Sequence, residues 1–306
     1  MIPKPAEKIH EFEWTDLETD QPYRRWREAR LAAAETAQGL DPVEVRDLAA
    51  PTESERGELI RRCDSVNFAH YVARRPDDPE QVAPALRRFA EAFGLRIAEA
   101  HRSAGDQGIV ALQPSEEEGK RGYIPYSTKP LKWHTDGYYN APGERISAFV
   151  LHCVRAAGSG GENRILDPEI LYIRLRDAHP DYLRALMHPQ AMTIPENREP
   201  NGRLRPASVG PVFYPDPGTG RLQMRYTART RSIEWRDDPT TRAAEAWLRD
   251  HLVRGDPLTC TLRLDAGQGI LNNNVLHDRT GFDRAPDAAQ SRLLYRVRFH
   301  NRIGGG

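Results

Sequence analysis

Short strand-forming segments constrain the fold of this chain more than any other feature. Runs rich in β-branched and alternating apolar residues recur along the 306 residues, and turns rich in Gly and Pro separate them. The expected strands cover residues 65–72, 145–154, 191–195, 211–214, 222–227, 258–264, 269–273 and 293–299. Helical patterns intervene at residues 23–38, 52–63, 78–93, 168–176, 180–187 and 238–253. The pattern predicts a mainly β fold with flanking helices, of the jelly-roll type.

Composition narrows the classes of function. Lys plus Arg and Asp plus Glu are both 44, so net charge gives no sign of a nucleic-acid or membrane partner. The 3 cysteines are widely spaced and form neither a metal-type pair nor a disulfide framework, which is typical of a reducing compartment. No apolar run is long enough to span a bilayer. We expect one cytoplasmic domain over residues 1–306, with residues 1–50 as a helical extension packed on it.

The segment Trp133–Gly137 carries the most informative chemistry. It places His134 and Asp136 two residues apart beside a strand-like run, and residues i and i+2 of a strand point to the same face. His277, much later in the chain, is the best candidate for a third ligand. Two His and one carboxylate with open positions select non-haem Fe(II). Residues 179–181 repeat the spacing, but Pro180 suits the first turn of a helix, so we interpret that copy as structural.

The last expected strand carries three arginines. Arg292, Arg296 and Arg298 alternate with apolar residues and therefore share one face. Three inward arginines would be costly if they were unpaired. They either face solvent or pair with acids on a neighbouring strand, or an inward arginine binds a carboxylate through its two-pronged guanidinium.

Residues 103–122 are predicted to form a long loop, because they are charged and poor in apolar residues. Two interpretations remain open, a solvated surface loop and a lid over an active site. The position of the loop just before the His134 segment favours the lid.

Four motifs in order resemble the TauD/TfdA superfamily, which includes γ-butyrobetaine hydroxylase and clavaminate synthase. They are His134-x-Asp136, Gly160–Asn163, Asn272–Arg279 and Arg292-x3-Arg296, and the resemblance covers residues 50–300. Members are Fe(II)- and 2-oxoglutarate-dependent oxygenases with a double-stranded β-helix fold. The resemblance thus implies a dioxygenase that uses iron, 2-oxoglutarate and O2, and releases succinate and CO2. Homo-oligomers are common in the family, so a homo-oligomer is expected here.

The resemblance also assigns roles to individual residues. It gives His134, Asp136 and His277 to iron and Arg292 to the distal carboxylate of 2-oxoglutarate. Asn163 stands where several members carry a Thr that also touches 2-oxoglutarate. Asp278 replaces the family's Gly after the second His, and we expect it to alter the pocket rim. The metal carboxylate is present, which disfavours the halogenating relatives.

Substrate contacts are expected around the metal carboxylate. Arg296 lies about 13 Å from Arg292 along the strand, too far for both to hold one small dicarboxylate. It therefore pairs with a buried acid or anchors a second anion, and the corresponding Arg of the taurine dioxygenase branch meets the substrate's anionic group. Tyr138, Tyr139 and Asn140 could supply a wall and polar contacts. We expect a small organic substrate that carries a carboxylate or sulfonate.

Two other classes fit the same residues. A jelly roll can serve as a binding module without catalysis. A zinc-dependent hydrolase is also possible, because His and carboxylate ligands suit zinc too.

Overall fold

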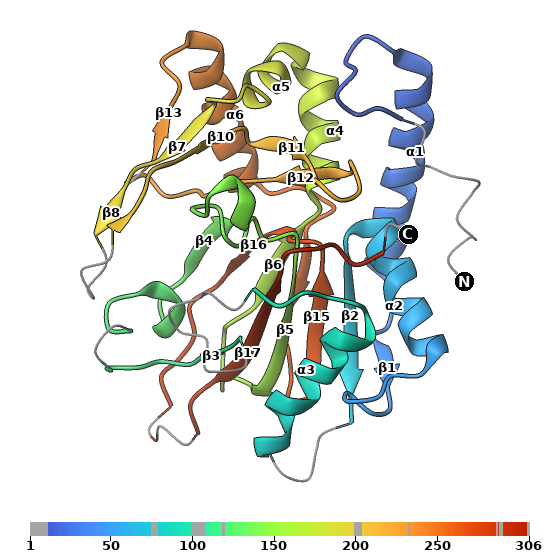
Figure 1. The fold of residues 1–306 in the computed structure, drawn as a ribbon, viewed down its shortest axis with the longest axis vertical. Helices are drawn as coiled ribbons and strands as arrows, with labels where there is room; N and C mark the ends of the chain where they lie inside the picture. Colours follow the sequence, from blue (N-terminus) through green and yellow to red (C-terminus); the bar gives the residue numbers. More distant parts are fainter. Residues whose placement is uncertain are drawn as a thin grey trace.

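Two β-sheets that pack against each other form the centre of the molecule (Figure 1). The computed structural model describes residues 12–74, 79–98, 108–117, 120–198, 204–231, 233–285, 287 and 290–304. The six-stranded sheet has the order β1 (Val43–Val45), β2 (Phe68–Ala73), β15 (Gln268–Asn272), β5 (Ala148–Arg155), β17 (Leu293–Phe299) and β3 (Ile109–Leu112). The four-stranded sheet has the order β14 (Cys260–Leu262), β6 (Asn163–Leu166), β16 (Leu276–Arg279) and β4 (Leu131–His134).

Strand pairing brings distant parts of the chain together. β15 and β17 each pair antiparallel with β5, and β17 also pairs antiparallel with β3. In the other sheet β16 lies antiparallel between β4 and β6. Apolar residues from both sheets, among them Phe149, Ile165 and Leu294, share one core cluster. The interior between the sheets is therefore the place where inward side chains of either sheet can meet.

Helices cover the outer face of the six-stranded sheet. α2 (Glu53–Val66) and α3 (Val82–Ala92) bury residues such as Leu59, Leu86 and Phe89 in one core cluster with that sheet. Thr52 and Glu55 form a capping box at the start of α2, as the sequence predicted for Thr52. α1 (Asp20–Ala37) contacts α2 and α4, and β1 adds a parallel edge strand to the sheet.

A helical layer with short strands lies at one end of the sheets (Figure 1). Its helices are α4 (Pro168–Ala178), α5 (Pro180–Leu186) and α6 (Pro239–Arg254). Its strands are β7 (Met192–Ile194), β10 (Ser208–Gly210), β13 (Glu234–Trp235), the hairpin β11 (Phe213–Pro215) and β12 (Leu222–Met224), and the pair β8 (Asn197–Arg198) and β9 (Leu204–Arg205). Across the described part of the chain, no helix has the length and apolar character needed to cross a membrane.

The predicted mainly β fold with flanking helices is confirmed, and two boundaries are corrected. The segment 103–122 was expected to be one long loop, but β3 lies within it and pairs with β17. The strand was missed because a run of only four apolar residues gives no clear strand pattern between charged and Gly-rich neighbours. Residues 103–107 and 118–119 of the predicted lid lie outside the described residues. The strand expected from residue 65 begins only at Phe68, because α2 continues through Val66 and Asn67 ends it in a left-handed conformation.

Candidate metal centre and cosubstrate pocket

The three predicted metal ligands come together between the two sheets. The register of β16 on β4 sets His277 opposite His134, and the centroids of their rings are 4.3 Å apart. One ligand atom from each of His134, Asp136 and His277 lies within 4.8 Å of the others. The strand argument placed His134 and Asp136 on one strand, but β4 ends at His134 and the carboxylate lies in the turn that follows. The grouping is therefore as predicted, although the local geometry is not.

Both imidazoles are oriented as metal ligands. Nδ1 of His134 donates a hydrogen bond to the carbonyl of Lys132, and Nδ1 of His277 donates to that of Val275, both at 2.9 Å. Burial lowers the pKa of both rings, and the neighbouring His277 adds to the effect on His134, whose pKa falls to about 3. The rings are therefore neutral at neutral pH, and each Nε2 keeps its lone pair for a metal.

Asp136 completes the donor set and is held on both sides. Its Oδ1 lies 3.1 Å from Nη1 of Arg296, while its buried Oδ2 has no hydrogen-bond partner among the described residues. The side chain of Asn274 accepts a hydrogen bond from the amide of Asp136 at 2.7 Å and donates to its carbonyl at 3.0 Å. Asn274 also donates to the carbonyl of Ile146 at 2.7 Å. Two neutral nitrogens and an orphaned carboxylate oxygen fit the ligand set that selects non-haem Fe(II).

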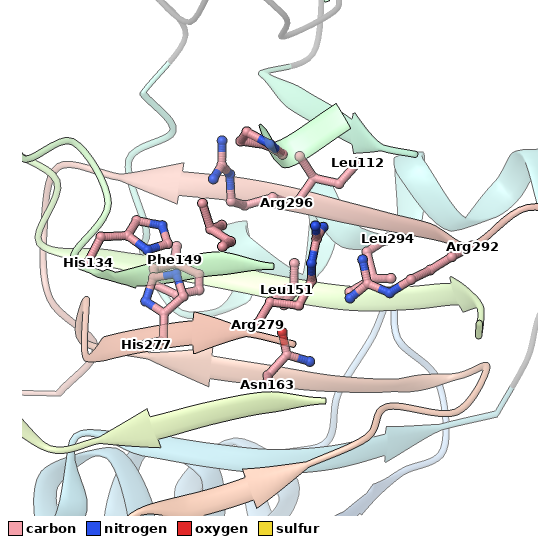
Figure 2. A pocket seen from close by; sticks show the side chains of 12 residues that line it. Leu112, His134, Phe149, Leu151, Asn163, His277, Arg279, Arg292, Leu294 and Arg296 are labelled. Carbon is pink, nitrogen blue, oxygen red and sulfur yellow. The ribbon is translucent and has the colours of Figure 1, made fainter. Parts of the chain in front are cut away.

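A pocket extends from the imidazoles along the interior between the sheets (Figure 2). Apolar side chains form much of its wall, namely Leu112, Pro125, Leu131, Phe149, Leu151 and Leu294. Asn163, Arg279, Arg292 and Arg296 supply the polar part. Figure 2 shows the two imidazoles at one end of the pocket and Arg292 toward the other. The two predicted histidine ligands and the predicted 2-oxoglutarate residues therefore share one cavity.

Arg292 is a buried cation without a counter-ion among the described residues. It is only 6% exposed, and its guanidinium carbon lies 5.1 Å from the centroid of the Phe282 ring. Burial lowers its pKa to about 10, which still leaves it charged at neutral pH. A buried charge without a partner is costly, so this position suits an anionic ligand.

Arg279 is a second cation in the pocket, and the sequence analysis gave it no role. It donates hydrogen bonds to the carbonyls of Ser127 and Lys129. Burial, and then the nearness of Arg292, lower its pKa to about 9. The available signal was the two-residue step from His277 within β16, which puts both side chains on the inward face.

Two further residues of the sequence analysis lie on β6 and β16. Asn163 is buried in the pocket wall, and its amide lies 3.5 Å from the carbonyl of Leu262. Asp278 was expected to alter the pocket rim, and this expectation is wrong. Because successive side chains of a strand point to opposite faces, the side chain of Asp278 points away from the pocket that His277 lines. On that opposite face it forms an ion pair with Arg164 of β6.

The segment 138–140, predicted to contact substrate, has its backbone fixed by the surrounding chain. Arg225, Arg205 and Ser208 donate hydrogen bonds to its three successive carbonyls, at 2.7, 3.3 and 2.8 Å. The segment therefore has a defined shape beside Asp136.

The side chains of this segment differ in their surroundings. The ring of Tyr138 is buried in the core, and the amide of Asn140 donates to the carbonyl of Glu144 at 2.8 Å. The ring of Tyr139 is partly exposed, and its hydroxyl accepts a hydrogen bond from Arg298 at 3.3 Å. The pocket wall described above includes none of the three, so their contact with substrate stays a prediction.

Comparison with known proteins adds independent information. Residues 31–298 match the family described as taurine catabolism dioxygenase TauD, TfdA family. A uridine-5′-phosphate dioxygenase from an Amycolatopsis species is 32% identical over 171 residues, which make up 53% of this chain and 60% of that protein. The match thus spans less than two thirds of that relative.

Solved structures of iron oxygenases share the fold. A structure of asparagine oxygenase in complex with Fe(II), 3-hydroxyasparagine and succinate superposes with a TM-score of 0.60, at 16% identity over 92% of both chains. The non-heme iron oxygenase OrfP, in complex with Fe, succinate and dihydroxy-L-Arg, gives a TM-score of 0.61 at 19% identity, over 89% of this chain and 91% of that one. At these identities the likeness concerns the fold alone.

Proposed function

Because the chain belongs to the taurine catabolism dioxygenase TauD, TfdA family, we propose that it is an Fe(II)- and 2-oxoglutarate-dependent oxygenase. The family match confirms the resemblance expected from the sequence. The observation that carries the proposal is the cluster of His134, Asp136 and His277, whose ligand atoms lie within 4.8 Å of one another. The proposed reaction oxidises a small organic substrate and releases succinate and CO2.

The pocket between the imidazoles and Arg292 is the proposed site of 2-oxoglutarate. The guanidinium of Arg292 would bind the distal carboxylate, and Asn163 lies in the wall beside it. Iron, when bound, supplies the chemistry that couples decarboxylation of 2-oxoglutarate to activation of O2. The protein holds the ligands in place, orients the cosubstrate through a charged contact at one end and keeps water out with an apolar wall.

We propose that the substrate is a small molecule with an anionic group. Arg296 lies beside the metal carboxylate, and Tyr138, Tyr139 and Asn140 follow Asp136 directly, which keeps them candidates for substrate contacts. The Amycolatopsis relative is named for a phosphate ester, uridine-5′-phosphate, so a phosphate joins the carboxylate and sulfonate expected from the sequence as a candidate anionic group.

The detailed fold, the domain organisation, the location and the oligomeric state expected from the sequence are also proposals. The two packed sheets are compatible with a double-stranded β-helix, the jelly roll that the resemblance implies. A single domain over residues 1–306 with an N-terminal extension, a cytoplasmic location and a homo-oligomeric state also stay predictions.

Succinate release tests the proposed function. The protein is incubated with Fe(II), 2-oxoglutarate and O2 against a panel of amino acids, sulfonates, betaines, aryloxy acids and phosphate esters. We expect at least one compound to stimulate succinate formation, and Asp136→Ala to abolish that stimulation. Oxidation of the compound at the wild-type rate by Asp136→Ala would refute the metal assignment. Hydrolysis by the zinc-loaded protein without O2 would favour a zinc enzyme, and an inert protein with every metal would favour a binding module.

A further inference from the structure

Arg298 is an inward-facing arginine of β17 that the proposed cosubstrate site does not use. It lies two residues beyond Arg296 on the same face of the strand, about 7 Å further from Arg292. Arg296 contacts Asp136, so Arg298 lies on the side of the metal ligands opposite to the proposed 2-oxoglutarate site. Only 5% of its surface is exposed.

The charge of Arg298 has no carboxylate partner in the part of the chain that the structure describes. Arg296 has a carboxylate partner 3.1 Å away, whereas Arg298 has none within the residues that the structure describes. Its Nη1 donates instead to the hydroxyl of Tyr139, a neutral group, at 3.3 Å. Burial lowers its pKa to about 10, so it is a cation at neutral pH. A buried cation facing a neutral hydroxyl calls for an anion from outside the described chain.

More positive charge surrounds the two tyrosines. The guanidinium carbon of Arg205 lies 5.8 Å from the ring centroid of Tyr139, and that of Arg229 lies 5.9 Å from the ring centroid of Tyr138. The two rings meet edge to face with centroids 5.1 Å apart. Neither Arg205 nor Arg229 has a carboxylate partner among the described residues.

Two other buried arginines have more partners within the chain. Arg30 forms an ion pair with Glu169, and Arg225 donates hydrogen bonds to four backbone carbonyls. The whole chain carries equal numbers of basic and acidic residues, so acids are not scarce. Among the described residues, the one acid noted near these tyrosines is the metal carboxylate Asp136, which pairs with Arg296, so Arg298, Arg205 and Arg229 leave a positive region next to the metal centre.

We propose that Arg298 and the hydroxyl of Tyr139 bind the anionic group of the substrate, and that this group is a phosphate monoester. The inference rests on the proposed function and adds the substrate class and the residues that recognise it. A phosphate monoester carries close to two negative charges and three acceptor oxygens, which suits the guanidinium of Arg298 and the hydroxyl of Tyr139, with Arg205 and Arg229 near the two tyrosine rings. A carboxylate or sulfonate carries one negative charge and would leave more of the positive charge unmatched. With the phosphate at Arg298, the body of the substrate would extend toward the metal ligands.

Binding to the anaerobic Fe(II)–2-oxoglutarate complex tests the site. The visible charge-transfer band of that complex is titrated with ribose 5-phosphate and uridine-5′-phosphate, with ribose, uridine and taurine as comparison ligands. We expect a phosphate ester to perturb the band at concentrations at least tenfold below those of its phosphate-free counterpart and of taurine.

Variants locate the site. Arg298→Gln should weaken phosphate-ester binding at least tenfold while the 2-oxoglutarate midpoint stays unchanged, and Arg298→Lys, which keeps the charge, should lose less. Tyr139→Phe should give a smaller loss than Arg298→Gln. The matched control is Arg254→Gln, which removes an exposed arginine on α6 and should bind all ligands like the wild type.

Several results would overturn the inference. They are equal binding of phosphate esters and their phosphate-free counterparts, tighter binding of taurine, and unchanged phosphate-ester affinity in Arg298→Gln. Loss of the 2-oxoglutarate band in both Arg298 variants would make Arg298 a structural residue and would also overturn it. A wild-type protein that forms no band would instead refute the proposed function, so the two failures are distinguishable.

Discussion

At the scale of single residues, the shape of a guanidinium matters as much as its charge. Arg292 can bind a carboxylate through two parallel hydrogen bonds, and lysine cannot. We predict that Arg292→Lys weakens 2-oxoglutarate binding by about 1.5–3 kcal/mol, roughly 10- to 100-fold, because charge-assisted hydrogen bonds have that strength. Fe(II) affinity should change little. A 2-oxoglutarate titration measures this, and unchanged affinity in Arg292→Ala would transfer the role to Arg279.

Asn274 shows how a residue without metal contact can orient a ligand. Its backbone is left-handed, with φ of 52°, and its side chain holds both the amide and the carbonyl of Asp136. Asn274→Gly removes both hydrogen bonds to the backbone of Asp136 without straining the backbone, because glycine readily adopts the left-handed conformation. We predict that it weakens Fe(II) binding about 10- to 100-fold, the effect typical of groups that orient metal ligands.

The matched control for this variant is Asn67→Gly. Asn67 is also buried and left-handed, with φ of 62°, but its side chain bonds to Asp167 and Arg302 instead of the metal ligands. It should lower stability and leave Fe(II) affinity unchanged. Equal metal affinities for the two variants in a metal titration would contradict the positioning role of Asn274.

At the scale of elements, a buried carboxylate joins α4 to α6. Asp256 follows α6 and accepts hydrogen bonds from Arg174 of α4 and His251 of α6, both at 3.0 Å. Burial alone would raise its pKa, but the hydrogen bonds from His251 and Arg174 outweigh it and hold the pKa well below the usual 3.8. We predict that Asp256→Asn lowers the free energy of unfolding at pH 7 by about 2 kcal/mol, because it removes the charge that accepts hydrogen bonds from the partly buried guanidinium of Arg174.

The sign of the pH dependence follows from the lowered pKa. The folded state favours the ionised carboxylate, so this stabilisation is present at neutral pH and is lost as the pH falls below about 4. Urea unfolding at pH 7 and pH 3 should therefore show a smaller difference between wild type and Asp256→Asn at the lower pH. The exposed Asp250→Asn on the same helix is the control. A difference that does not change with pH would contradict the assignment.

Prediction from the sequence succeeded for elements that have a local signal. Thr52 caps α2, and the turn predicted at residues 215–220 joins the two strands of the hairpin, β11 and β12. β3 was missed because four apolar residues carry no periodicity, and it exists through its pairing with β17. The side-chain partners of Asn274 and Arg296 depend on contacts between segments far apart in the chain, which local patterns do not encode.

At the scale of the whole molecule, the fold brings distant segments to one site. The spacing of His134 and Asp136 indicated a metal, but only the pairing of β4 with β16 sets His277 opposite His134. Arg296 of β17 in the other sheet, and Arg292 directly before that strand, line the same pocket from across the interior. Stretches that lie far apart in the sequence thus supply one pocket between two sheets, and a change that shifts one sheet against the other should affect metal and cosubstrate together.

The central claim is that His134, Asp136 and His277 hold an iron to which 2-oxoglutarate binds in the pocket that ends at Arg292. Absorption of the anaerobic protein with Fe(II), titrated with 2-oxoglutarate, tests this most directly. We predict a visible charge-transfer band that saturates with 2-oxoglutarate, is absent from Asp136→Ala, and needs a higher 2-oxoglutarate concentration in Arg292→Lys. A wild-type protein without the band, or a band that survives unchanged in Asp136→Ala, would contradict the account.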